Sequence, residues 1–166
     1  MALILNGDTG ITYPVATATG SATQASAGRV LQVVQGTLAS QFSSSTSSMA
    51  STGLTASITP SSSSNKVLIS ISCTTVTAVN GQLVAWDIYR NSTAINGDAT
   101  YGLAQFYVPS GQLQTNSAYV YLDSPATTSA TSYTLYARNN GAGTFYIGSS
   151  SANSPKATII LMEISA

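Results

Sequence analysis

The chain has 166 residues and a formal net charge of zero, and charged residues make up only 6% of it, against roughly 25% in an ordinary soluble protein. Its five cations are too few for a nucleic-acid surface, and without histidine it lacks the commonest general base and metal ligand. One cysteine excludes an intrachain disulfide framework, and no apolar run reaches the roughly 20 residues of a membrane span. This composition predicts a structural protein that is not an enzyme and binds no cofactor.

The first 28 residues are predicted to form an anchoring arm ahead of a single domain at residues 29–166. Residues 15–28 read VATATGSATQASAG, which is too poor in large apolar side chains to fold alone. The arm is either a disordered tail or an anchor that adds a strand to a partner's sheet. We favour the anchor because apolar side chains gather at the far end of the tether: Leu3, Ile4, Leu5 and Ile11. The N-terminus has no positively charged region and too short an apolar run for a secretion signal, so we expect synthesis in the cytoplasm.

From residue 29 onward, strand signals alternate with turn signals such as Asn80-Gly81. The predicted strands are Val30–Gln35, Leu54–Thr59, Lys66–Thr75, Gln82–Arg90, Tyr101–Val108, Ala118–Asp123, Ser132–Asn139, Thr144–Gly148 and Thr158–Ile164. No segment keeps a 3.6-residue apolar period. The predicted fold class is therefore all-β, an antiparallel β-sandwich or jelly-roll-like domain.

Period-2 alternation predicts which face of each strand lies in the core. In the Ala118–Asp123 strand, Val120 and Leu122 are assigned to the core. The same reasoning assigns the aliphatic sides of the other strands to the core, which leaves a set of tyrosines outside it: Tyr89, Tyr119, Tyr121 and Tyr136. Exposed aromatic side chains are typical of an interface.

The last predicted strand is apolar on both faces. Ile160, Met162 and Ile164 are assigned to the core, which leaves Ile159 and Leu161 on the opposite face. Such a strand indicates that a second subunit, or a loop of the same chain, covers the outer face. Ile159 and Leu161 therefore join the four tyrosines as a candidate oligomer interface or receptor surface.

Catalytic and metal-binding arrangements are weakly supported. Asp87, Asp98 and Asp123 could supply a carboxylate pair for glycan cleavage only if two of them converged in a groove. We expect Asp98 and Asp123 instead to lie in turns and accept hydrogen bonds from nearby backbone N–H groups. Two Asn-Gly-Asp turns could offer oxygens to Ca²⁺, but they lack the acidic spacing of a calcium loop. We predict neither a catalytic nor a metal site.

Six pieces of the chain, in order, resemble a β-domain common in tailed-bacteriophage fibre and virion structural proteins. They are Gly28–Val34, Gly53–Ser61, Asn65–Ile69, Tyr89–Ile95, Tyr121–Thr131 followed by Tyr133, and Met162–Ile164. The resemblance covers residues 28–166. It implies an oligomeric β-sandwich, most simply a homotrimer, on the outside of a phage particle, with no catalytic residues to carry over.

The resemblance and the arm together predict a short tail-fibre or spike component. Its partners would be further copies of itself, other virion proteins bound through the arm, and a host surface carbohydrate. The alternative is a capsid decoration (cement) protein that stabilises the head shell. In the resembled proteins this module often ends a much longer fibre, whereas here only a short arm precedes it, which keeps both placements open. We expect neither nucleic-acid binding nor membrane insertion.

Overall fold

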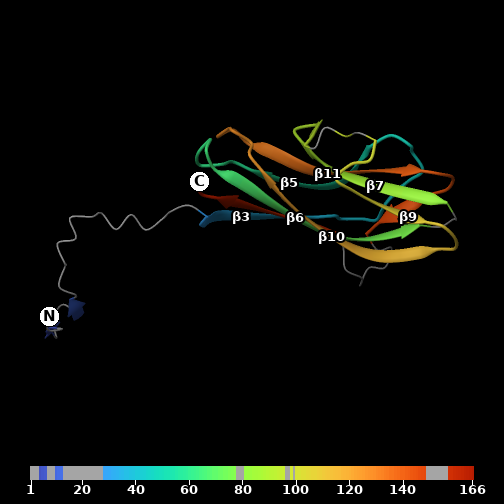
Figure 1. The fold of residues 1–166 in the computed structure, drawn as a ribbon. Coiled ribbons are helices and arrows are strands. Elements are labelled where there is room, and N and C mark those ends of the chain that lie inside the picture. The colour runs from blue at the N-terminus through green and yellow to red at the C-terminus, as the bar shows by residue number, and fades with distance from the viewer. Residues whose placement is uncertain are drawn as a thin grey trace.

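The computed structural model describes residues 4–6, 10–12, 28–77, 81–95, 98, 100–148 and 157–166. These residues form strands and turns, and no helix among them is long and apolar enough to cross a membrane. Two antiparallel sheets lie over one another in two layers (Figure 1). The predicted all-β antiparallel sandwich is confirmed.

One layer is a six-stranded sheet with the order β3-β13-β6-β12-β4, in which β10 pairs with the other edge of β6. Its strands are β3 (Val30–Thr37), β4 (Phe42–Ser44), β6 (Lys66–Thr77), β10 (Leu113–Asp123), β12 (Phe145–Ile147) and β13 (Thr158–Ile164). Both β13 and β12 pair with the same edge of the long strand β6, one after the other along its length. The central part of this layer therefore has the order β3-β13-β6-β10.

The other layer is a five-stranded sheet with the order β5-β11-β7-β8, in which β9 also pairs with β7. Its strands are β5 (Ala50–Ile58), β7 (Gln82–Arg90), β8 (Thr93–Ala94), β9 (Ala104–Val108) and β11 (Thr131–Asn140). All nine predicted strands are present, and the short strands β4 and β8 were not predicted. Asn91 and Ser92 have positive φ angles of 48° and 77°, which suit the two-residue turn between β7 and β8.

The predicted arm lies largely outside the described residues, including the anchor candidate Leu3. Within it, β1 (Ile4–Asn6) and β2 (Gly10–Thr12) form a separate antiparallel pair in which Leu5 lies opposite Ile11. The backbone there is extended, as an anchor that adds a strand requires. Nothing in the structure tests whether Ile4, Leu5 and Ile11 bind a partner.

The core lies between the two layers. Its largest fully buried side chains include Trp86, Tyr133 and Phe145, and Trp86 of β7 reaches across to Tyr119 of β10, with ring centroids 5.6 Å apart. The layers approach closely at Gly36, where a Cβ atom would lie 2.0 Å from the carbonyl oxygen of Thr55. Only glycine fits there.

The face assignment is confirmed for β6, β7 and β11 but is wrong for β10. Val120 and Leu122, predicted to lie in the core, are 69% and 48% exposed, whereas Tyr119 and Tyr121, predicted to lie outside, are half-buried and pack against the core. The reason lies at the end of the strand. Asp123 ends the strand on the inward face with the two tyrosines and is buried, so the aliphatic face, which the alternation assigned to the core, is the outer one.

The same reversal occurs in β13. Ile159 and Leu161 are fully buried core residues rather than outward-facing ones. Ile160, Met162 and Ile164 lie on the outer face and are half-buried by their neighbours within the sheet. Glu163 shares the inward face and is 1% exposed. The observation that both faces are apolar is correct, but the two faces are exchanged.

Candidate functional site

The arm joins the sandwich where the chain also ends. The backbone N–H of Gly28 donates to the carbonyl oxygen of Ser165 at 2.8 Å, and the N–H of Ser165 donates to the carbonyl oxygen of Arg29 at 2.9 Å. At this end of the sandwich, β5, β7, β10 and β13 finish and β6 and β11 begin. We call it the arm end (Figure 1). An anchored domain would transmit load through it.

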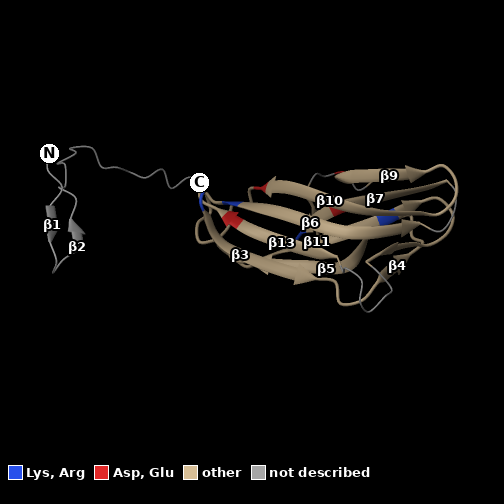
Figure 2. Cartoon of the chain, turned by 90° about the horizontal axis from the view of Figure 1, so that it is seen from below, with Lys and Arg blue, Asp and Glu red and all other residues tan. Residues whose placement is uncertain are grey.

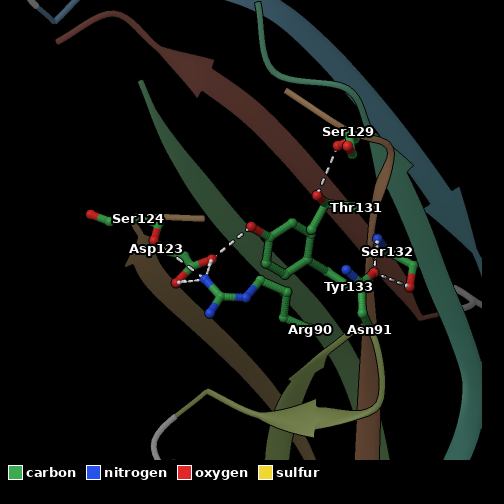
Figure 3. A network of polar contacts seen from close by, with 8 residues as sticks. All are labelled: Arg90, Asn91, Asp123, Ser124, Ser129, Thr131, Ser132 and Tyr133. Atoms are coloured by element: carbon green, nitrogen blue, oxygen red, sulfur yellow. Dashed lines mark hydrogen bonds and ion pairs between the residues drawn. The ribbon is translucent and has the colours of Figure 1, made fainter. Parts of the chain in front are cut away.

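A buried carboxylate network holds β7, β10 and β11 together at the arm end (Figure 3). Arg90 donates through Nη1 to both carboxylate oxygens of Asp123, at 3.0 and 2.8 Å. The phenol of Tyr133 donates to Asp123 Oδ2 at 2.7 Å. Because Tyr133 is fully buried, and because its hydroxyl hydrogen-bonds a carboxylate, its pKa is raised. Asp123 was predicted to lie in a turn and bind backbone N–H groups; it instead makes an ion pair at the end of β10.

A second carboxylate joins β13 to the segment between β5 and β6. Glu163 accepts hydrogen bonds from Asn65 Nδ2 and Gln32 Nε2, both at 2.6 Å, and from the backbone N–H and hydroxyl of Ser61 at 2.7 and 2.8 Å. Burial alone would raise the pKa of Glu163, but these hydrogen bonds to the ionised form outweigh it and hold the pKa at about 2. The carboxylate is charged and fully engaged.

These two networks draw on every piece of the phage-domain resemblance. The six pieces that carry the resemblance contain the members of both networks: Gln32, Ser61, Asn65, Arg90, Asp123, Tyr133 and Glu163. Asn91, from the same set, accepts hydrogen bonds through Oδ1 from the N–H and hydroxyl of Ser132 on β11 at 2.9 and 3.1 Å (Figure 3). Residues far apart in sequence thus meet at the arm end, which gives the order of those pieces a structural basis.

A tyrosine pair lies on the outer face of the five-stranded sheet. The rings of Tyr89 and Tyr136 stack with centroids 3.8 Å apart and an interplanar angle of 15°. As predicted, both lie outside the core, and both are half-buried. Asp87 lies beside them on the same face but is fully buried. Burial raises the pKa of Asp87 to about 6. The hydrogen bond that it accepts from the Ile88 N–H lowers this pKa, and the nearby charge of Asp98 raises it further.

An apolar surface covers the outer face of the six-stranded sheet. The register places Val33, Met162, Leu68 and Leu122 side by side across β3, β13, β6 and β10. The next row contains Gln35, Ile160, Ser70 and Val120. We call the six hydrophobic members of these rows the outer apolar face: Val33, Leu68, Val120, Leu122, Ile160 and Met162. The pattern analysis missed this face because it assigned four of the six to the core.

Four of the predicted interface residues are therefore placed differently from the expectation. Tyr89 and Tyr136 lie together on one outer face. Tyr119 and Tyr121 line the inner side of β10, and Ile159 and Leu161 are buried inside this chain. The signal that could have revealed the true outer surface was present in the sequence, since β13 is apolar on both faces.

Asp98 and Asp123 are both held by contacts within the domain. Asp98 accepts hydrogen bonds from the N–H groups of Thr100 and Tyr101 at 2.8 and 3.0 Å, as its predicted turn requires, and Asp123 is held by Arg90. Among the described residues, no three acidic or thiol side chains gather to hold a metal ion. A pocket of about 10 Å³ beside Trp86 and Tyr119 has room for at most one water molecule.

Comparisons with known proteins find no matching family model and no matching curated protein. Among solved structures, a chain from the structure of infectious bursal disease virus, Gx strain, is similar with a TM-score of 0.47 and 16% identity. The match covers 83% of this chain and 38% of that one. A likeness at this level carries no argument about function, and the β-sandwich rests on the sheets described above.

Proposed function

We propose that this chain is a non-enzymatic structural protein on the exterior of a tailed-phage virion, a short tail-fibre or spike component anchored by its N-terminal arm. The observation that carries the proposal is the convergence of all the phage-like pieces at the arm end. There, Asp123 and Glu163 tie β3, β7, β10, β11 and β13 together. A domain held by one end needs its strands joined most firmly where the tether begins.

The placement is tested by gold labelling of intact phage particles with an antibody against residues 28–166, viewed by electron microscopy. We expect label on the tail. Label spread over the head would support the capsid decoration protein instead, and particles without label would overturn the virion proposal.

The anchoring role is tested by removing residues 1–27. We expect the remaining domain to stay folded, because the networks at the arm end lie within residues 28–166, and to be lost from purified particles. Particles that incorporate the truncated chain as well as the full chain would overturn the anchor. The retained thermal unfolding transition of the truncated domain is the control.

Contact with a host surface carbohydrate is proposed for the Tyr89–Tyr136 pair. Flat aromatic rings stack on the apolar faces of sugars, and the pair lies on a sheet face lined by hydroxyl side chains such as Thr134. Tyr136→Ala should reduce binding to host cells while leaving the mass of the assembly unchanged. Unchanged cell binding would refute the receptor role, and a lower mass would assign the pair to a subunit contact.

A further inference from the structure

The two outer faces of the sandwich differ in chemistry. On the five-stranded sheet, the edge strand β5 presents Ser51, Gly53, Thr55 and Ser57 to solvent, and the Tyr89–Tyr136 pair lies farther in, on β7 and β11. On the six-stranded sheet, the outer apolar face presents six large hydrophobic side chains in two adjacent rows. Val33 and Val120 are 59% and 69% exposed. Leaving such a face in water costs free energy that a partner would recover.

We propose that the outer apolar face is the contact between two copies of this chain, stacked sheet against sheet about a two-fold axis. The proposal goes beyond the virion role and stands whether or not the chain belongs to a phage.

The electrostatics of the face favour a second copy over a charged partner. The described residues that point outward from β3, β13, β6 and β10 include one charged side chain, Lys66, at the arm end of β6. Figure 2 shows how sparsely charged residues are distributed over the sheets. A two-fold contact sets each surface against its own copy, so a neutral apolar face meets an equally neutral one.

The size of the whole outer surface of this layer also fits. Four strands about 4.8 Å apart give a width of about 19 Å, and the 11 residues of β10 run for about 37 Å. Beyond the ends of β13 and β3, β12 and β4 continue the same layer. The resulting footprint of about 700 Å², in which uncharged rows continue beyond the outer apolar face, is close to the roughly 800 Å² that each partner buries in a stable protein interface.

This geometry differs from the homotrimer that the resemblance implies. A flat face that meets itself closes after two copies, whereas three-fold symmetry needs two different surfaces on each subunit. Sheets stacked in this way lie about 10 Å apart with interdigitated side chains. The expected mass is therefore twice the 16.9 kDa of one chain.

The test is the mass of the full chain by light scattering, for wild type and two variants. Val120→Lys places a charge in the proposed contact, at a position too exposed to disturb the core. Ser57→Lys adds the same charge to the exposed face of the other sheet and is the matched control. We expect the wild type and Ser57→Lys to be dimers and Val120→Lys to have half their mass, with all three retaining the same far-UV circular dichroism.

Hydroxyl-radical footprinting locates the contact independently. Met162 lies on the outer apolar face, and Met49, half-buried beside β5, is an internal control away from it. We expect Met162 oxidation to fall as wild-type concentration rises, with Met49 oxidation constant. A monomeric wild type, a trimer, an assembly that survives Val120→Lys, or equal behaviour of the two methionines would each overturn the proposal.

Discussion

Replacing Tyr133 with phenylalanine tests whether the arm end is held by the Asp123 network. Tyr133 is fully buried, and its hydroxyl donates to Asp123 Oδ2 at 2.7 Å. Hydrogen bonds to charged groups contribute about 1.5–3 kcal/mol. Asp123 keeps its ion pair with Arg90, whose side chain is 36% exposed and can rearrange in solvent. We therefore expect the low end of that range, a loss of about 1.5 kcal/mol, which lowers Tm by about 3–6 °C for a domain of this size.

The assay is thermal and urea unfolding of both the variant and a matched control. Tyr121→Phe removes the same hydroxyl from another tyrosine on the inner side of the sandwich, for which the described residues provide no hydrogen-bond partner. The control should unfold within about 0.5 kcal/mol of wild type. If the two variants lose the same stability, the Asp123 bond contributes nothing and the inference that this network holds the arm end is wrong.

Gly36→Ala should lower the free energy of unfolding by about 1–3 kcal/mol in urea titrations, because its Cβ would lie 2.0 Å from the Thr55 carbonyl oxygen. A variant as stable as the wild type would show that the two sheets move apart there at no cost. The pKa of Asp87 is raised from 3.8 to about 6, so the stability it contributes is present below pH 3.8 and is lost as the pH rises through 6. The pKa of Glu163 is lowered from 4.5 to about 2, so its contribution is present above pH 4.5 and is lost as the pH falls toward 2. The pH profile of Tm should therefore peak near pH 4, with Asp87→Asn flattening its alkaline side and Glu163→Gln its acid side; unchanged profiles would contradict both assignments. Glu163→Leu removes the carboxylate that selects the register of β13, so we expect two registers and doubled amide resonances for this strand in NMR spectra. A single set of resonances would show that the carboxylate does not select the register.

The sequence was sufficient to predict the fold class, all the long strands and the inward faces of β6, β7 and β11. In those strands, large apolar residues alternate with small or polar ones, as with Val67, Ile69 and Ile71 against Ser70 and Ser72. One face then gains far more than the other from burial, which makes the alternation reliable. Short strands such as β4 were missed because three residues carry too little alternation.

The networks at the arm end could not be predicted because their members are distant in sequence. Asp123 and Arg90 are separated by 33 residues, and Glu163 and Ser61 by 102. A pattern within one strand reports which face is apolar, and it carries no information about which strand lies opposite. The resemblance named these residues without indicating that they meet.

The two reversed strands have a common physical cause, which also explains why buried acids occupy the arm end. In β13 both faces are apolar, so a one-residue slip would exchange Ile159 and Leu161 for Ile160 and Met162 with little change in buried apolar area. Hydrophobic burial alone therefore does not select the register. The carboxylate of Glu163 does, because a slip would turn it away from its hydrogen-bond donors Asn65, Gln32 and Ser61. Asp123 provides the same discrimination for β10 through Tyr133. The two buried acidic residues are thus the ones that specify which apolar face points inward and which lies on the outer surface.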